Sequence, residues 1–331
     1  LGLIPVIATR DPLSLVVSNA LVWPITIAWA AKSGVTLRPA RSLRIAGERF
    51  VQSTVLLNLA NWVSYNGLAW AVSRFVSVST LGLYSRTWLL ADLPAQGMAS
   101  ATSQVLFPSF TQMDDEEHRG VAADALAAMT AVTTALLGTI AALASLLVTV
   151  LLGERWLDAV PLLAVLGISL ATMPPQWLLS SQLQARDQFR DLAASRAAGL
   201  ATTAAFAALV AATGEVTVAA IGVGVVHAAL HAVDLRTAAR SGLLTPARVG
   251  RAYIAAAVAC SPLWAIAIAQ ATGTWSPTGV AGLGLLIAVT LAAAACTTLL
   301  TLRGPSGEVL LRRGLVPSRV PGFLLPRGAT R

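Results

Sequence analysis

The chain has 331 residues, of which 56% are hydrophobic and 11% are charged, and its formal net charge is +8. Soluble domains carry about 25% charged residues, so this chain could not cover a water-exposed surface of its size. The composition therefore excludes a soluble globular enzyme and predicts an all-α integral membrane protein, a polytopic helix bundle. The arginines lie in gaps between apolar runs, so their excess indicates membrane orientation, and no nucleic-acid partner is predicted.

A helix needs about 20 apolar residues to cross the hydrocarbon core, and by that measure the chain contains about nine transmembrane helices. Four prolines lie inside the predicted spans, where neighbouring helices can satisfy the carbonyls that a proline frees. These are Pro24, Pro94, Pro174 and Pro175. The spans are predicted at residues 13–32, 51–72, 81–106, 125–151, 159–184, 197–213, 218–238, 252–271 and 280–302.

Basic connections alternate along the chain with connections that hold almost no positive charge, except that connection 107–124, on the same side as the basic ones, is acidic. The basic ones are 33–50, 185–196, 239–251 and the tail 303–331. The positive-inside rule places these connections, and the C-terminus with them, on the cytoplasmic side of the cell membrane. Each arginine near an anionic leaflet adds about 1 kcal/mol, so the tail is predicted to lie on membrane lipids or to stay disordered.

The third predicted span carries polar residues at a spacing of three to four, which places them on one helix face. Asp92 lies about 16 Å from the start of the span, near the membrane midplane, where an ionisable side chain is functional by default. One interpretation is the wall of a transport path, with Arg86 offering a fork of donors to a phosphate. The other is an interhelical hydrogen-bond seam in which Asp92 pairs with a basic group. The candidates here are Arg86, Asp92, Gln96, Ser100 and Gln104.

The second predicted span supplies three asparagines and a tyrosine on one helix face. Their amides could bind sugar hydroxyls or the polar side of the third span, and simple contacts between helices are an equal alternative. The residues are Asn58, Asn61, Tyr65 and Asn66.

The seventh predicted span holds His227, His231 and Asp234 at positions i, i+4 and i+7. This spacing is compatible with a proton relay. As a metal site it is incomplete, with two imidazoles, one carboxylate and no glutamate base, so neither a metal nor a cofactor is predicted. The structural alternative pairs Asp234 with Arg236 or with a neighbouring arginine.

Three stretches together resemble the polysaccharide flippase family, the exporters of lipid-linked oligosaccharide within the multidrug/oligosaccharidyl-lipid/polysaccharide exporter superfamily. The resemblance covers roughly residues 40–190. The stretches are LGLYSR at 81–86 running on to Pro94, VLFPSF at 105–110 followed by the acidic residues 114–117, and GERWLDAVP at 153–161.

The resemblance implies an organisation in lobes. Segment 1–32 would be the last helix of a truncated N-terminal lobe, and 33–50 a basic cytoplasmic linker. Segment 51–238 would be a six-helix, flippase-like C-terminal lobe, 239–302 two additional transmembrane helices, and 303–331 an Arg-rich cytoplasmic tail. We therefore expect the sequence to be part of a longer protein.

The function implied by the resemblance is transport, not enzymatic catalysis. The chain would flip an undecaprenyl-pyrophosphate-type lipid-linked oligosaccharide across the cytoplasmic membrane for surface polysaccharide or lipopolysaccharide biosynthesis. A polysaccharide polymerase and glycosyltransferases are the implied protein partners. Two alternatives stay open: a cation-coupled small-molecule exporter, and a non-transporting truncated remnant or scaffold.

Overall fold

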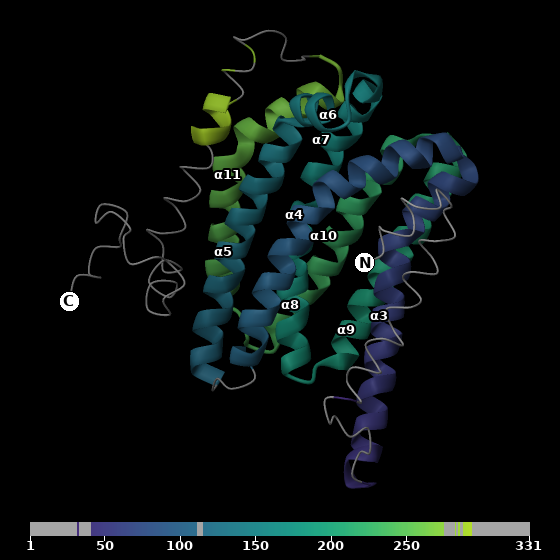
Figure 1. Cartoon of the computed structure of the whole chain (residues 1–331). Coiled ribbons are helices and arrows are strands. Elements are labelled where there is room, and N and C mark those ends of the chain that lie inside the picture. Colours follow the sequence, from purple (N-terminus) through teal and green to yellow (C-terminus); the bar gives the residue numbers. More distant parts are fainter. Residues whose placement is uncertain are drawn as a thin grey trace, which may run out of the picture. The chain divides into compact units, whose positions relative to one another are not determined.

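The computed structural model describes residues 41–110 and 115–274, together with Lys32 and positions 282, 284 and 287–292 (Figure 1). Within these residues every regular element is a helix, which confirms the predicted all-α fold class. Leu1–Val55 and Leu56–Arg331 form two compact units, and the packed core lies in the second. The elements are α3 (Arg41–Phe75), α4 (Val78–Phe110), α5 (Asp115–Ala142), α6 (Ala144–Leu151), η1 (Glu154–Ala159), α7 (Val160–Ser169), η2 (Leu170–Thr172), α8 (Met173–Ala185), α9 (Phe189–Thr213), α10 (Val216–Arg240) and α11 (Pro246–Ala271).

Five described helical segments are long and apolar enough to cross a membrane, and each overlaps a predicted span. The spans predicted at 51–72 and 81–106 lie in α3 and α4, which are helical but are not among these five. The spans predicted at 13–32 and 280–302 fall largely outside the described residues, as does the tail. A polytopic membrane protein is therefore supported, whereas the number nine is not confirmed. The five segments are Val121–Ala142, Glu154–Ala185, Phe189–Thr213, Val216–Arg240 and Val249–Ala271.

The span predicted at 125–151 is interrupted at Leu143, between α5 and α6. Gln270 of α11 reaches this break: its Nε2 donates to the carbonyl oxygen of Ala142 at 2.5 Å, and its Oε1 accepts from the backbone N–H of Ser145 at 3.1 Å. Hydrocarbon offers no water to these backbone groups. The glutamine therefore stabilises the break and ties α11 to α5.

We expect replacement of Gln270 by leucine to lower the free energy of unfolding by about 2–4 kcal/mol, because two buried backbone groups lose their partner. Reversible unfolding in mixed micelles measures this. Thr272→Val is the control, because Thr272 is exposed and bonds to α11 and to Thr274 only. Equal stabilities for the two variants would contradict this role of Gln270.

The span predicted at 159–184 is also divided, into α7, the short turn η2 and α8. Pro174 and Pro175 lie in the first turn of α8, where a missing N–H costs no helical hydrogen bond. Thr133 of α5 donates from Oγ1 to the carbonyl of Ala171 at 3.2 Å, which satisfies one group at the break. Two helical segments thus make up this predicted span, and they meet just before the two prolines that the sequence places inside it.

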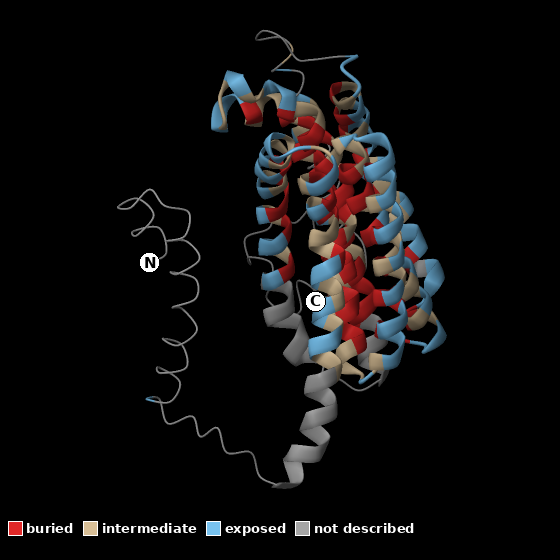
Figure 2. Cartoon of the chain, turned by 90° about the vertical axis from the view of Figure 1, so that its right-hand side faces the viewer, coloured by how far each residue is buried: buried red, intermediate tan, exposed pale blue. Residues whose placement is uncertain are grey.

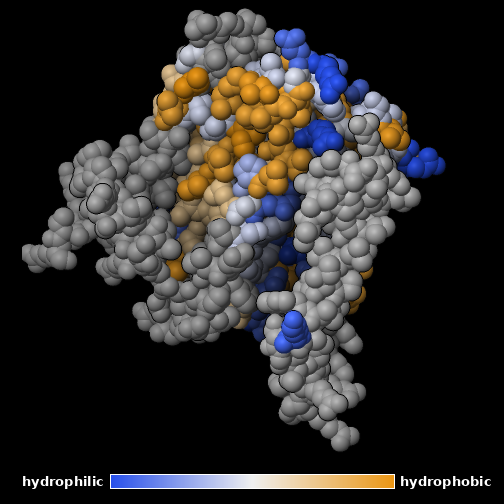
Figure 3. Space-filling view, viewed as in Figure 1, coloured by the Kyte–Doolittle hydropathy of each residue, from blue (hydrophilic) through white to orange (hydrophobic). Residues whose placement is uncertain are grey.

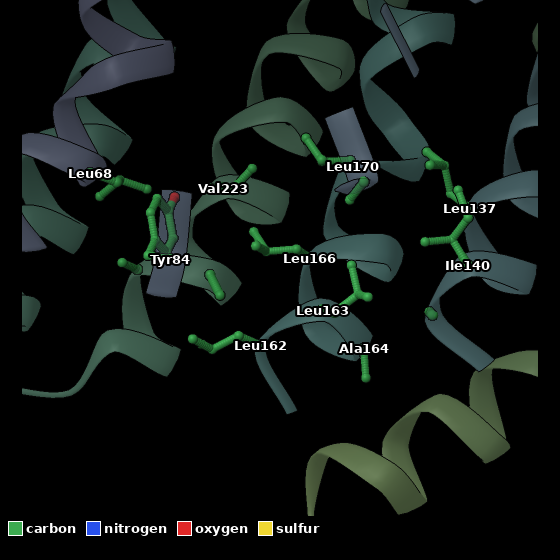
Figure 4. Close-up of a cluster of buried hydrophobic side chains, with 14 of the residues drawn as sticks. Leu68, Tyr84, Leu137, Ile140, Leu162, Leu163, Ala164, Leu166, Leu170 and Val223 are labelled. Atoms are coloured by element: carbon green, nitrogen blue, oxygen red, sulfur yellow. The ribbon is translucent and has the colours of Figure 1, made fainter. Parts of the chain in front are cut away.

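The core is centred on α7, which packs against α4, α5, α10 and α11. Leu163 and Leu166 of α7 are fully buried, and Tyr84 of α4, Leu137 of α5 and Val223 of α10 belong to the same apolar cluster (Figure 4). Figure 2 shows buried positions along the inside of the bundle and exposed positions on its outer faces. Four different helices are therefore anchored to one central helix.

Small residues allow α3 to approach α9 closely. A Cβ on Gly67 would lie 2.7 Å from Cγ2 of Thr203, and a Cβ on Gly199 would lie 3.3 Å from Oγ of Ser64. Thr203 Oγ1 also donates to the carbonyl of Ser64 at 3.4 Å. Both α9 residues are near the middle of Phe189–Thr213, a segment apolar enough to span the membrane. The part of α3 around residues 64–67 therefore packs beside the middle of that segment.

Candidate functional site

Asp92 lies where α4 meets α3, and it is 5% exposed. The amide Nε2 of Gln96, one turn later, donates to Oδ2 of Asp92 and, at 3.0 Å, to the hydroxyl of Tyr65 on α3. Trp88 Nε1 donates to the same hydroxyl at 3.2 Å. A tyrosine from one helix and an amide from the other thus hold the carboxylate at the junction.

The structure gives Asp92 an amide partner instead of the basic partner that the seam interpretation requires. Within the described residues no basic side chain pairs with it, and its Oδ1 has no hydrogen-bond partner. A buried carboxylate without a counter-charge is costly, and inside a membrane such groups mark transport paths or relays. The hydrogen bonds between α3 and α4 agree with the seam, whereas the missing basic partner does not, and a functional role for Asp92 stays a proposal.

Aromatic rings fix the position of Tyr65. Its ring meets Trp88 edge-on, with centroids 5.0 Å apart, and His227 of α10 edge-on at 6.5 Å. Trp88 in turn packs against Tyr84, with centroids at 5.7 Å. Edge-to-face pairs of this kind stabilise by about 0.5–1.5 kcal/mol beyond burial. Three helices, α3, α4 and α10, therefore meet at Tyr65.

We expect Tyr65→Phe to lower the free energy of unfolding by about 1–3 kcal/mol, because two N–H donors lose their acceptor. Tyr84→Phe is the matched control, since the buried hydroxyl of Tyr84 has no partner and its loss is neutral or stabilising. Both variants are measured by reversible unfolding. A larger loss for Tyr84→Phe would show that the hydroxyl network does not stabilise the junction.

Two of the other candidates on α4 do not join the Asp92 cluster. Arg86 and Ser100 are exposed, and neither hydrogen-bonds to the cluster. The side chain of Gln104 lies outside the described residues. In Figure 3, hydrophilic atoms gather in the middle of the face over which α4 runs, below a broad apolar area.

The asparagines of α3 lie beside this cluster without joining it. Asn58 is exposed and Asn61 is half-buried. Asn66 donates from Nδ2 to the carbonyl of Trp62, on its own helix, at 2.9 Å. Among the described contacts none of the three bonds to α4, and the choice between sugar binding and contact between helices stays open for them.

The residues predicted as a proton relay are all buried, but their side chains diverge to three helices. His227 faces Tyr65 of α3. His231 pairs through Nε2 with the hydroxyl of Tyr253 on α11. Asp234 reaches α8. Within the described residues no group of three or more His, Cys, Asp and Glu could hold a metal ion.

Asp234 belongs to a buried polar network shared by α8, α9 and α10. Its Oδ2 accepts from Ser180 Oγ at 2.7 Å and from Gln176 Nε2 at 3.2 Å. Arg196 Nη2 donates to Ser180 Oγ at 3.1 Å, so this hydroxyl bridges the two opposite charges. Arg236 is exposed. The structural alternative for Asp234 is therefore supported, with Arg196 as the neighbouring arginine.

Sequence reasoning missed Arg196, Ser180 and Gln176. Arg196 was assigned to a basic connection, whereas the structure places it seven residues inside α9 with 7% exposure. The signal was available: an arginine two turns inside an alanine-rich helix that must cross apolar surroundings needs a buried partner. Asp234 on α10 is likewise a charged residue inside an apolar helix that needs a buried partner.

Part of the chain is similar in sequence to known polysaccharide biosynthesis proteins. Residues 12–161 match the sequence profile of a family described as polysaccharide biosynthesis protein. The resemblance to polysaccharide exporters is confirmed. The succinoglycan biosynthesis transport protein ExoT of Rhizobium meliloti (strain 1021) is 35% identical over 136 residues, which cover 40% of this chain and 27% of that protein. The match thus spans about a quarter of the length of that relative, and no solved structure matches the chain.

The matched segment contains the Asp92 cluster and both helices that build it. The names of the family and of the relative point to a polysaccharide transporter and not to an enzyme. The buried Arg196 network lies beyond residue 161 and outside the match to the family.

Proposed function

We propose that this chain is part of a flippase that moves a polyprenyl-pyrophosphate-linked oligosaccharide from the inner to the outer leaflet. The observation that carries the proposal is the uncompensated carboxylate of Asp92, buried at the junction of α3 and α4 inside the segment that matches the polysaccharide family. Exposed Arg86, on the same helix, supplies a fork of donors suited to a pyrophosphate.

The proposed setting is the cytoplasmic membrane, with the basic connections and the C-terminus in the cytoplasm. The described helices 51–238 would be one lobe of a two-lobed transporter that alternates access around a path between lobes. Membrane lipids, a polysaccharide polymerase and glycosyltransferases are the proposed partners.

Deletion of the gene in its own host tests the proposal. We expect surface polysaccharide to be lost and lipid-linked oligosaccharide to accumulate on the inner leaflet, and the wild-type gene to restore both. Unchanged polysaccharide with no accumulated intermediate would overturn the proposed function.

Two alternative functions predict different results in the same strains. A cation-coupled small-molecule exporter would change resistance to toxic compounds and leave polysaccharide intact. A scaffold would be needed for polysaccharide, but variants Arg86→Ala and Asp92→Asn would both complement fully.

A further inference from the structure

The break between α5 and α6 is confined to one residue. The N–H of Leu143 still donates to the carbonyl of Thr139 at 2.8 Å, and the N–H of Leu147 donates to the carbonyl of Leu143 at 2.9 Å. Leu143 itself has φ −91° and ψ 11°, whereas residues in an α-helix have ψ of about −42°. A single residue with a non-helical ψ therefore joins the two helical arms.

Gln270 takes the place of two bonds that an unbroken helix would make. In such a helix the carbonyl of Ala142 would accept from the N–H of Leu146. The N–H of Ser145 would donate to the carbonyl of Ala141 in the same way. Here the one amide of Gln270 serves both Ala142 and Ser145, and a side chain inserted into the helical bonds is one of the causes of a kink. A straight form of the span would satisfy the same two backbone groups without the glutamine.

The arm before the break is held on two sides. Helix α5 packs closely against α7, where a Cβ on Gly167 would lie 2.8 Å from Cβ of Ala141. It also packs against α11, where a Cβ on Gly138 would lie 3.4 Å from Cβ of Leu263. Close-packed contacts of this kind resist displacement. The end of α5 is therefore a fixed base for whatever follows the break.

The arm after the break is held along a narrow stripe. Of the eight residues of α6, Ala144 and Val148 are buried, whereas Val150 is 70% exposed. A turn at Gly153, with φ 92°, leads from α6 into η1, and α6 packs against η1. Helix α6 and η1 therefore form one arm that is free to turn about Leu143 while α5 stays in place.

The amide of Gln270 has a second environment within reach. Gln270 lies in the last turn of α11, which ends at Ala271, and the next residues, 272–274, are exposed. In the bent form its side chain is 3% exposed. Rotation of the side chain toward the exposed end of α11 gives the amide water as its partner, so leaving the break does not strand a buried polar group.

We propose that Gln270 is the latch of a hinge at Leu143. The span is bent while the amide occupies the break. When the amide leaves, the helical bonds close and α6 and η1 swing into line with α5. This device goes beyond the proposed function, and it gives a role to α11, which lies outside the segment that matches the polysaccharide family. The loss of stability expected for Gln270→Leu then measures how far the latch favours the bent form.

Distances between spin labels on the full-length protein in nanodiscs test the hinge, with the two native cysteines replaced by alanine. One label pair joins Val150 of α6 to Val258 of α11, and the other joins Val132 of α5 to Val258; all three positions are exposed. A kink of about 20° moves the end of an eight-residue helix, about 12 Å long, by about 4 Å. Gln270→Leu should shift the first distance by about 2–4 Å and leave the second unchanged. Thr272→Val should change neither.

Adding Leu146→Pro to Gln270→Leu separates closure of the helical bonds from a general loss of packing. Proline fits the first turn of α6, but it has no N–H to offer the carbonyl of Ala142, so the break persists. The double variant should return the first distance to that of wild type. The hinge is overturned if Gln270→Leu keeps the wild-type distance, or if the double variant shifts as far as Gln270→Leu alone. These distances involve no substrate, so either result leaves the proposed function to its own test.

Discussion

Replacement of Arg196 by methionine is expected to lower the free energy of unfolding by about 3–5 kcal/mol, because it leaves the carboxylate of Asp234 buried without a counter-charge. Arg196 is 7% exposed and reaches Asp234 through the hydroxyl of Ser180. Methionine keeps most of the side-chain length and fits an apolar interior. Reversible unfolding in mixed micelles is the measurement.

Two further variants make this expectation specific. Adding Asp234→Asn to Arg196→Met should recover at least half of the lost stability, because no uncompensated charge remains. Arg236→Met, at an exposed position on α10, should change stability by no more than about 0.5 kcal/mol. Equal losses for Arg196→Met and Arg236→Met would show that the buried network does not hold α8, α9 and α10 together.

Replacement of Asp92 by asparagine is expected to move stability and transport in opposite directions. Removing an unpaired buried charge should raise the free energy of unfolding by about 1–3 kcal/mol, because asparagine has nearly the same shape. Surface polysaccharide should fall at least tenfold in the host strain, because the proposed transport path loses its buried carboxylate.

Asp158→Asn is the control for this variant, since Asp158 is an exposed acidic residue of η1. It should leave both quantities unchanged. If Asp92→Asn destabilised the protein and left polysaccharide output intact, Asp92 would be a structural residue.

Hydropathy and charge predicted the helical class and the position of most helices. Pro174 and Pro175 indicated an irregularity next to residues 170–172. The break at Leu143 was not predictable from these patterns, because it depends on a side chain far away in sequence, Gln270, whose amide satisfies the backbone of α5 and α6. Periodicity reports which face of a helix is apolar, but it does not report a partner 128 residues away.

For the site, helical spacing correctly placed Asp92 and Gln96 together, because residues at i and i+4 meet on one face. It also placed His227, His231 and Asp234 on one buried face of α10. What it could not show is that these three side chains contact three different helices. Such contacts are set by the packing of whole helices.

Direct flipping by the protein purified from its host tests the central claim. The protein is reconstituted in liposomes that carry fluorescent lipid-linked oligosaccharide, and exposure of the sugar on the opposite leaflet is followed with a membrane-impermeant lectin. We predict a rate well above that of protein-free liposomes and a return to near that background with Asp92→Asn. A wild-type rate no higher than that of empty liposomes would contradict the proposed function.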